Sequence, residues 1–89
     1  MTHYRITPTA LVAPLEDGTV ILNMRTNRYY SLNETGALVW TMLEQGQPRE
    51  FIVARLVQTF DVSSADAEHA VAALLRELSA EQLIEIAAK

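Results

Sequence analysis

Three short segments in the first third of the chain have the hydrophobic pattern of β-strands. Ala10–Leu15 alternates between two sets of side chains, as in a strand with one face buried. Residues 19–24 contain the run Val20-Ile21-Leu22, which is apolar on both faces and suits the middle strand of a sheet. Arg28–Leu32 contains two tyrosines, which favour an extended backbone. The pattern predicts a three-stranded antiparallel β-meander.

The connections between these segments are typical of hairpins. Glu16-Asp17-Gly18 ends in a pair that tolerates positive φ, and residues 25–27 make the second turn. Pro14 lacks an amide hydrogen, which places its strand at the outside of the sheet. Residues 1–8 show little pattern, and we expect them to be a loosely held lead-in.

The third strand runs directly into a helix. Period two puts Tyr30 and Leu32 on one face of this strand, with Tyr29 and Ser31 on the other. Asn33 is a good helix N-cap, because its side chain accepts from amides of the first turn. We therefore place the boundary between strand and helix at Leu32 and Asn33, with one face of the strand in the core.

Three helices are predicted after the meander. The first covers residues 34–45 and stops at Gly46, and the second has Pro48 in its first turn and ends near residue 60. Ser63 caps the third helix, which continues to about residue 78. Residues 79–89 fit either a last helical turn or a short extended piece. The predicted fold class is α+β, with three strands followed by three helices.

Composition indicates one globular domain covering residues 1–89. Apolar residues make up 49% of the chain and charged residues 20%, which is an ordinary globular balance. The absence of cysteine excludes disulfides and thiolate metal sites, and no apolar run reaches the roughly 20 residues that a membrane span needs. We therefore expect a cytoplasmic protein with no membrane partner.

The sequence offers little chemistry for catalysis. His3 and His69 are separated by most of the chain, and Gly18, Gly36 and Gly46 match neither a phosphate-binding loop nor a dinucleotide fingerprint. No serine stands in a nucleophile elbow. We predict a protein that is not an enzyme, with no catalytic residue, no metal and no cofactor.

An unpaired strand edge is the feature that remains. Such an edge is either blunted by charge and proline or used for pairing with another chain. The first strand has Pro14, whereas Arg28–Leu32 has no proline, so the third strand is the better docking edge. Two other readings stay open: the edge is idle, or two copies of the chain pair there as a homodimer.

Taken together, these motifs resemble the PqqD-like family, the recognition elements that bind precursors of ribosomally made, modified peptides. The similarity covers about residues 10–86. Its specific part is the tyrosine strand followed by an Asn-Glu-Thr-Gly-Ala segment and a tryptophan, which here reads Arg28-Tyr29-Tyr30-Ser31-Leu32-Asn33-Glu34-Thr35-Gly36-Ala37-Leu38-Val39-Trp40. The helices are less specific.

The resemblance implies a winged-helix-like fold that binds the leader segment of a precursor peptide. The leader would add as a strand beside the third strand and lie in the cleft between that strand and the third helix. Carried over by position, the peptide-binding residues would be Arg28, Tyr29, Tyr30, Ser31 and Leu32 on the strand, with Asp66, His69, Ala70, Ala73, Leu74 and Glu77 on the helix.

A free-standing member of this length resembles most the recognition protein of a lasso-peptide cluster. Its further partners would then be a leader peptidase and a macrolactam synthetase. One alternative is the member of the pyrroloquinoline quinone pathway, which presents its peptide to a radical enzyme. Another is a winged-helix DNA-binding regulator, against which the net charge of −4 argues, because phosphate binding depends on lysine and arginine.

Overall fold

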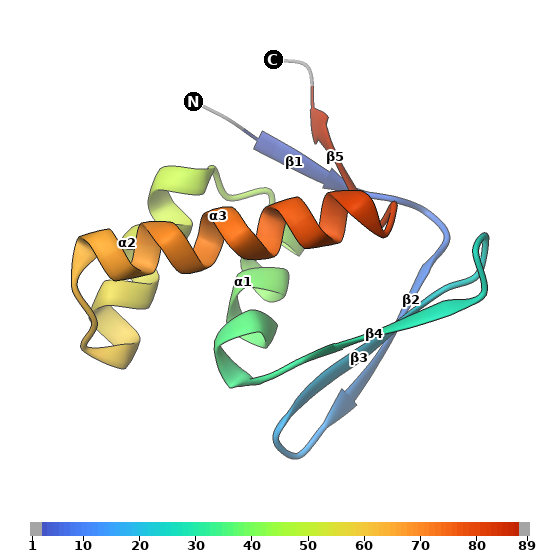
Figure 1. Cartoon of the computed structure of the whole chain (residues 1–89), viewed down its shortest axis with the longest axis horizontal. Coiled ribbons are helices and arrows are strands. Elements are labelled where there is room, and N and C mark those ends of the chain that lie inside the picture. Colours follow the sequence, from blue (N-terminus) through green and yellow to red (C-terminus); the bar gives the residue numbers. More distant parts are fainter. Residues whose placement is uncertain (1–2, 88–89) are drawn as a thin grey trace.

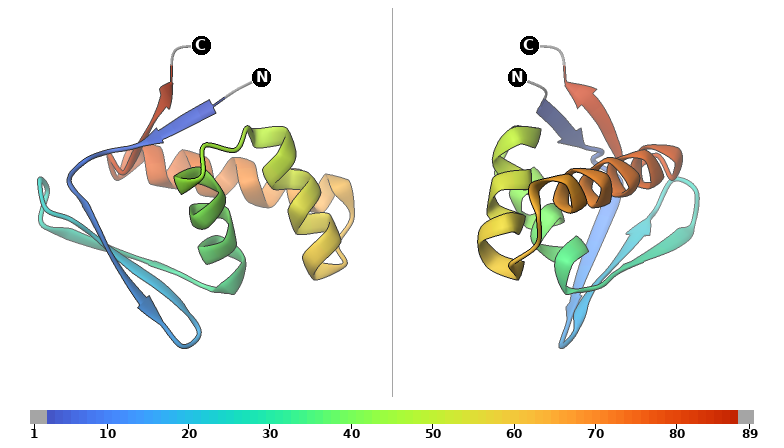
Figure 2. Two further views of the ribbon diagram at one scale, coloured as in Figure 1. Left: turned by 180° about the vertical axis from the view of Figure 1, so that it is seen from behind. Right: turned by 60° about the vertical axis from the view of Figure 1, so that its left-hand side comes forward.

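The computed structural model describes residues 3–87 and divides them into a three-stranded sheet, a group of three helices and a small two-stranded sheet (Figure 1). In Figures 1 and 2 the three-stranded sheet extends away from the helices, while the two-stranded sheet lies at the end near both termini. The predicted fold class is confirmed, with the two-stranded sheet as an addition that the pattern did not indicate.

The meander consists of β2 (Ala10–Leu15), β3 (Gly18–Asn23) and β4 (Arg28–Leu32) in the order β2-β3-β4. Both pairings are antiparallel, and Ile21 at the centre of β3 pairs with Tyr30 of β4. Ile21 and Leu32 are buried, whereas Tyr29 is 72% exposed. The predicted alternation along the third strand is therefore confirmed.

The first hairpin differs from the prediction in its loop. Leu15 pairs with Gly18, so the loop is Glu16 and Asp17, and neither of these residues nor Gly18 has a positive φ in the left-handed region. Glycine is required here by packing, because a Cβ atom at Gly18 would lie 2.0 Å from the carbonyl oxygen of Leu32. The close approach of β3 to the end of β4 thus explains the glycine.

The helices are α1 (Glu34–Glu44), α2 (Arg49–Phe60) and α3 (Ser64–Ala80), close to the predicted ranges. The Asn33 side chain accepts from the Gly36 amide, and Ser63 accepts from the Asp66 amide, so both predicted N-caps are confirmed. Pro48 is the N-cap of α2 rather than part of its first turn. The helices pack around one core that includes Trp40, Ile52, Leu56, Val71 and Leu78.

The two chain ends form the part of the fold that was not predicted. β1 (His3–Ile6) pairs antiparallel with β5 (Ile84–Ala87), so the expectation of a loose lead-in was wrong for residues 3–6. The segment after the third helix takes both of the open alternatives, first a final helical turn to Ala80 and then an extended piece. Tyr4 and Ile6 pack against the core, which gives β1 a reason to be ordered.

Candidate functional site

The free edge of β4 is the first component of the candidate site. β3 pairs with one side of β4, and no other strand among residues 3–87 lies on its opposite side. Backbone groups of an antiparallel strand point alternately to its two sides, so half of those in Arg28–Leu32 face this free side. We call this row of groups the β4 edge.

A cleft of about 440 Å³ lies alongside the β4 edge and separates it from α3. We call it the β4–α3 cleft. Its walls come from β4, from the start of α1 and from the middle of α3, and are formed by Tyr30, Ser31, Leu32, Asn33, Thr35, Gly36, Ala70, Ala73, Leu74 and Glu77. An open strand edge and a partly apolar groove therefore lie side by side.

Small side chains keep this cleft open. Ala70 and Ala73 are one helical turn apart, so they share the face of α3 that lies over the cleft. On the opposite wall, Gly36 packs against Leu32, where a Cβ atom would come within 2.9 Å of the Leu32 side chain. Larger residues at these positions would occupy the space that a ligand side chain needs.

Two polar contacts connect β4 to α3 at one end of the cleft. The Arg28 guanidinium donates to both carboxylate oxygens of Glu81, at 2.9 and 3.1 Å. The Tyr30 hydroxyl donates to Glu77 Oε1. Burial, the hydrogen bond to Glu77 and the nearby carboxylates raise the pKa of Tyr30 to about 12, so this hydroxyl remains a neutral donor at ordinary pH.

The predicted binding residues do not all line the cleft. Seven of them do, namely Tyr30, Ser31, Leu32, Ala70, Ala73, Leu74 and Glu77. Tyr29 points to the outer face of the sheet, and Arg28 lies next to the cleft in a second hollow. Asp66 is in the first turn of α3, and His69 lies in a separate hollow with Arg49 and Glu68. The cleft is thus lined by three of the five predicted strand residues and by four of the six predicted helix residues.

Three cleft residues were missed by reasoning from the sequence. Asn33, Thr35 and Gly36 line the cleft because β4 passes into α1 without a loop, so the first turn of the helix continues the wall of the strand. The sequence did contain a signal for these residues, because the predicted strand ends directly at the predicted N-cap Asn33, without a loop. Glu81 was also missed, since its contact with Arg28 joins residues 53 positions apart.

The described residues contain no cluster of three or more histidine, aspartate or glutamate side chains that could hold a metal ion. None of the helices in this part of the chain is long and apolar enough to cross a membrane. What the geometry of the site offers is hydrogen-bonding backbone and apolar contact, which are means of binding an extended chain.

The site can be compared with known proteins. The family model described as coenzyme PQQ synthesis protein D (PqqD) matches residues 18–84. No curated protein matches the sequence. One similar solved structure is titled "TbiB1 in Complex with the TbiA(beta) Leader Peptide", with 28% identity, a TM-score of 0.87 and coverage of 96% of this chain and 99% of the other.

A second similar structure is titled "Lasso peptide synthetase B1 complexed with the leader peptide". It is 30% identical, with a TM-score of 0.84, and the match covers 92% of this chain and 96% of the other. The matched family region contains the β4 edge and every element that forms the β4–α3 cleft. On these grounds the chain belongs to the PqqD family.

Proposed function

We propose that this chain binds the leader segment of a ribosomally made precursor peptide. The leader adds as a strand to the β4 edge and places alternate side chains in the β4–α3 cleft. The observation that carries this proposal is the free edge of β4 beside a cleft of about 440 Å³. Two proteins that resemble this chain over more than nine-tenths of its length are described as complexes with leader peptides, which supports the same role here.

The energetics require both components of the site. Each backbone hydrogen bond contributes only about 0.5–1.5 kcal/mol net, and ordering a flexible leader costs free energy. Burying two leader side chains of roughly 120 Å² each, at about 25 cal/mol per Å², contributes about 6 kcal/mol before losses. The edge therefore supplies strand pairing that tolerates many sequences, and the cleft supplies affinity and selectivity.

The finer assignment is to lasso-peptide biosynthesis. In this pathway the chain would present the precursor to a separate leader peptidase and then to a macrolactam synthetase. The resemblance to a lasso peptide synthetase B1 over 92% of this chain supports this assignment. The name of the matching family model favours one alternative, a PqqD-type carrier that presents its peptide to a radical enzyme.

Proline substitution in β4 tests strand addition. The amides of Tyr29 and Tyr30 point to opposite sides of the strand, so one of the two faces the free edge. Proline at that position removes a donor to the leader while the β3 pairing remains, and we expect at least a tenfold loss of affinity with little change in the unfolding midpoint. The probe is a fluorescently labelled leader peptide.

Alanine at each position is the matched control, because it shortens the side chain and keeps the amide. Tyr29→Ala should therefore lose much less affinity than Tyr29→Pro if the outward amide belongs to Tyr29, and the same comparison applies at Tyr30. Unchanged leader affinity in both proline variants, with the fold intact, would refute docking at the β4 edge.

A further inference from the structure

A second hollow of about 310 Å³ lies at the Arg28 end of β4 and is lined by Thr26, Arg28, Ala80, Glu81 and Gln82. β4 and α3 run in opposite senses, so the Leu32 end of the strand lies near Ala70 and the Arg28 end lies near Glu81. The contact between Tyr30 and Glu77 stands between the two hollows. They are therefore consecutive compartments along one seam.

We call the place where the two hollows meet, at Tyr30 and Glu77, the junction. The charges at this junction do not cancel. Arg28 is engaged with both oxygens of Glu81, whereas the contact of Glu77 is the neutral hydroxyl of Tyr30. No lysine or arginine among residues 3–87 forms a salt bridge with Glu77. The C-terminal end of a helix adds partial negative charge. Two carboxylates therefore face one guanidinium.

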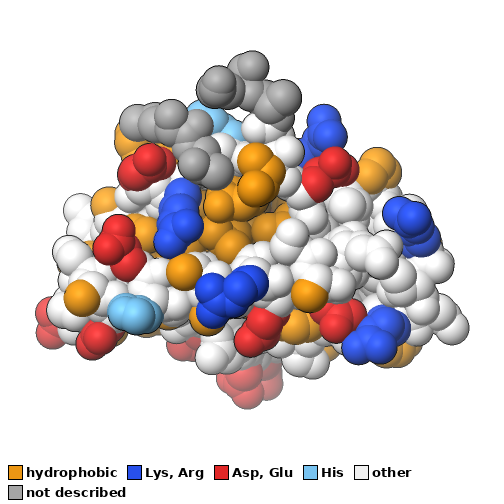
Figure 3. Space-filling model, turned by 45° about the horizontal axis from the view of Figure 1, so that its top comes forward, with side chains coloured by type: hydrophobic (Ala, Val, Ile, Leu, Met, Phe, Trp, Pro, Cys, Tyr) orange, Lys and Arg blue, Asp and Glu red, His pale blue; other side chains and the backbone are white. Residues whose placement is uncertain are grey.

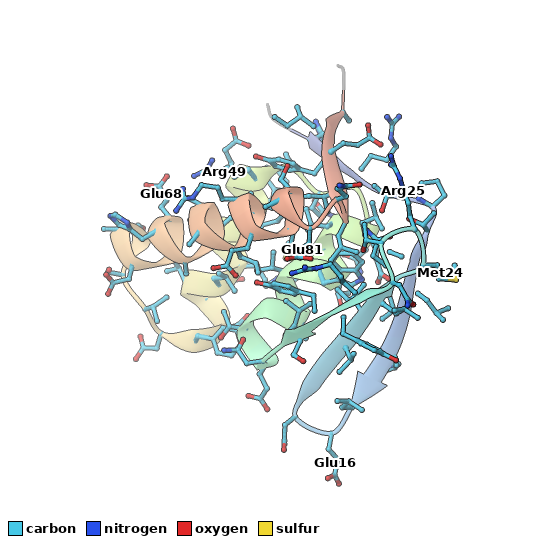
Figure 4. The ribbon with its side chains drawn as sticks, turned by 45° about the vertical axis from the view of Figure 1, so that its right-hand side comes forward. Glu16, Met24, Arg25, Arg49, Glu68 and Glu81 are labelled. Atoms are coloured by element: carbon cyan, nitrogen blue, oxygen red, sulfur yellow. The ribbon has the colours of Figure 1, made fainter. Side chains whose placement is uncertain are left out.

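The other arginines among residues 3–87 lie elsewhere. In Figure 4 Glu81 lies between α3 and β4, whereas the side chain of Arg25, in the turn between β3 and β4, extends away from it. Arg76 precedes Glu77 directly in α3, and neighbouring positions of a helix point in different directions. Within residues 3–87, Glu77 therefore has no cationic partner at this junction.

We propose that the bound peptide carries a lysine or arginine side chain that enters this junction and pairs with Glu77. This inference rests on the proposed function and names the chemistry that the site selects. A cation with a long apolar stem fits a compartment that is apolar on the Leu74 side and acidic at Glu77. An acidic side chain at the same place is repelled by both carboxylates.

Strand geometry also fixes where the basic residue stands in the peptide. Side chains on one face of a strand recur every second residue, at about 6.6 Å. Arg28, Tyr30 and Leu32 are on one face of β4, and a peptide strand paired with β4 keeps the same spacing. The basic residue therefore stands two or four positions from the apolar residue that enters the cleft beside Leu32, and not one or three.

A peptide library tests this inference without knowledge of the natural leader. Random 16-residue peptides displayed on phage are selected on the wild-type chain and on Glu77→Gln, which keeps an oxygen that accepts from Tyr30. We expect wild-type binders to have lysine or arginine two or four positions from an apolar residue, and Glu77→Gln binders to lose this enrichment. The control is Glu68→Gln, the same charge change on another face of α3, where Glu68 lies by Arg49 (Figure 4).

Titration of one selected peptide completes the test. Glu77→Gln should weaken its binding about three- to tenfold, and Glu68→Gln less than twofold. Binders with no basic residue at this spacing, or equal binding to wild type and Glu77→Gln, would overturn the inference and leave the proposed function standing. A wild-type chain that selects no peptide at all would overturn both.

Discussion

At the scale of single residues, Asn23 at the end of β3 connects parts of the chain that are far apart in sequence. Its side chain is 1% exposed and takes part in four hydrogen bonds. The amide donates to the carbonyl oxygens of Glu81 and Gln82, and the oxygen accepts from the Thr9 hydroxyl and the Arg25 amide. Asn23 thereby holds the end of α3 against the sheet that carries the β4 edge.

We predict that Asn23→Ala lowers the free energy of unfolding by about 2–4 kcal/mol, because it leaves buried groups without partners. Urea denaturation measures the loss. Thr9→Val is the graded control, since it removes only one of the four hydrogen bonds and should cost about 1 kcal/mol. Equal stabilities for Asn23→Ala and the wild type would contradict this account of how α3 is fixed.

The small residues of α3 give a second prediction at this scale. Ala73→Glu places a longer, charged side chain in the β4–α3 cleft, so we expect leader binding to weaken at least tenfold without loss of folding. Ala72→Glu is the matched control, because Ala72 is the adjacent residue and lies in the hollow of His69. Fluorescence titration of both variants checks the prediction, and similar affinities would place the groove elsewhere.

At the scale of elements, the sequence predicted those parts whose pattern is local. The meander and helices follow from alternation, helical spacing and caps such as Asn33 and Ser63, all of which act over a few residues. The β1–β5 sheet could not be found in this way, because its strands have four residues each and pair across almost the whole chain. Strands this short carry too few positions for a period-two pattern.

The same limit applies to the candidate site. The residues that line the strand side of the cleft can be predicted from the alternation along Arg28–Leu32, because it places Tyr30 and Leu32 on the same face. The helix side depends on how α3 is rotated about its axis, and this rotation is set by packing with distant elements. For that reason His69 was assigned to the cleft from the sequence but lies in another hollow.

The two-stranded sheet yields a prediction about stability alone. Ile6 is partly buried against the core, so Ile6→Ala should lower the free energy of unfolding by about 1–2 kcal/mol. Ile86 on the partner strand is 69% exposed, and Ile86→Ala should cost less than about 0.5 kcal/mol. Thermal denaturation compares the two variants. Ile6 and Ile86 lie on the same face of the strand pair, so a larger effect of Ile86→Ala would mean that the outer end of β5, and not Ile6, packs against the core.

At the scale of the whole molecule, charge distinguishes peptide binding from DNA binding within a shared architecture. The combination of a small sheet with three helices is shared with winged-helix regulators, which place a helix against DNA. This chain has a net charge of −4, and its α3 carries Asp66, Glu68 and Glu77 against Arg76 alone. On the face drawn in Figure 3, acidic and basic side chains are interspersed among the described residues, without a continuous basic surface.

We therefore predict no mobility shift of a 20-base-pair duplex in a gel at low salt, where phosphate attraction is strongest. The same preparation should bind leader peptide, which shows that the protein is folded and active.

A variant in which Asp66, Glu68 and Glu77 are all replaced by lysine tests whether charge is the reason. Its charge change of six should produce weak, salt-sensitive DNA binding if charge is what excludes DNA. A shift with the wild-type chain at micromolar concentration would instead mean that α3 tolerates phosphates, and the regulator reading would regain its physical basis.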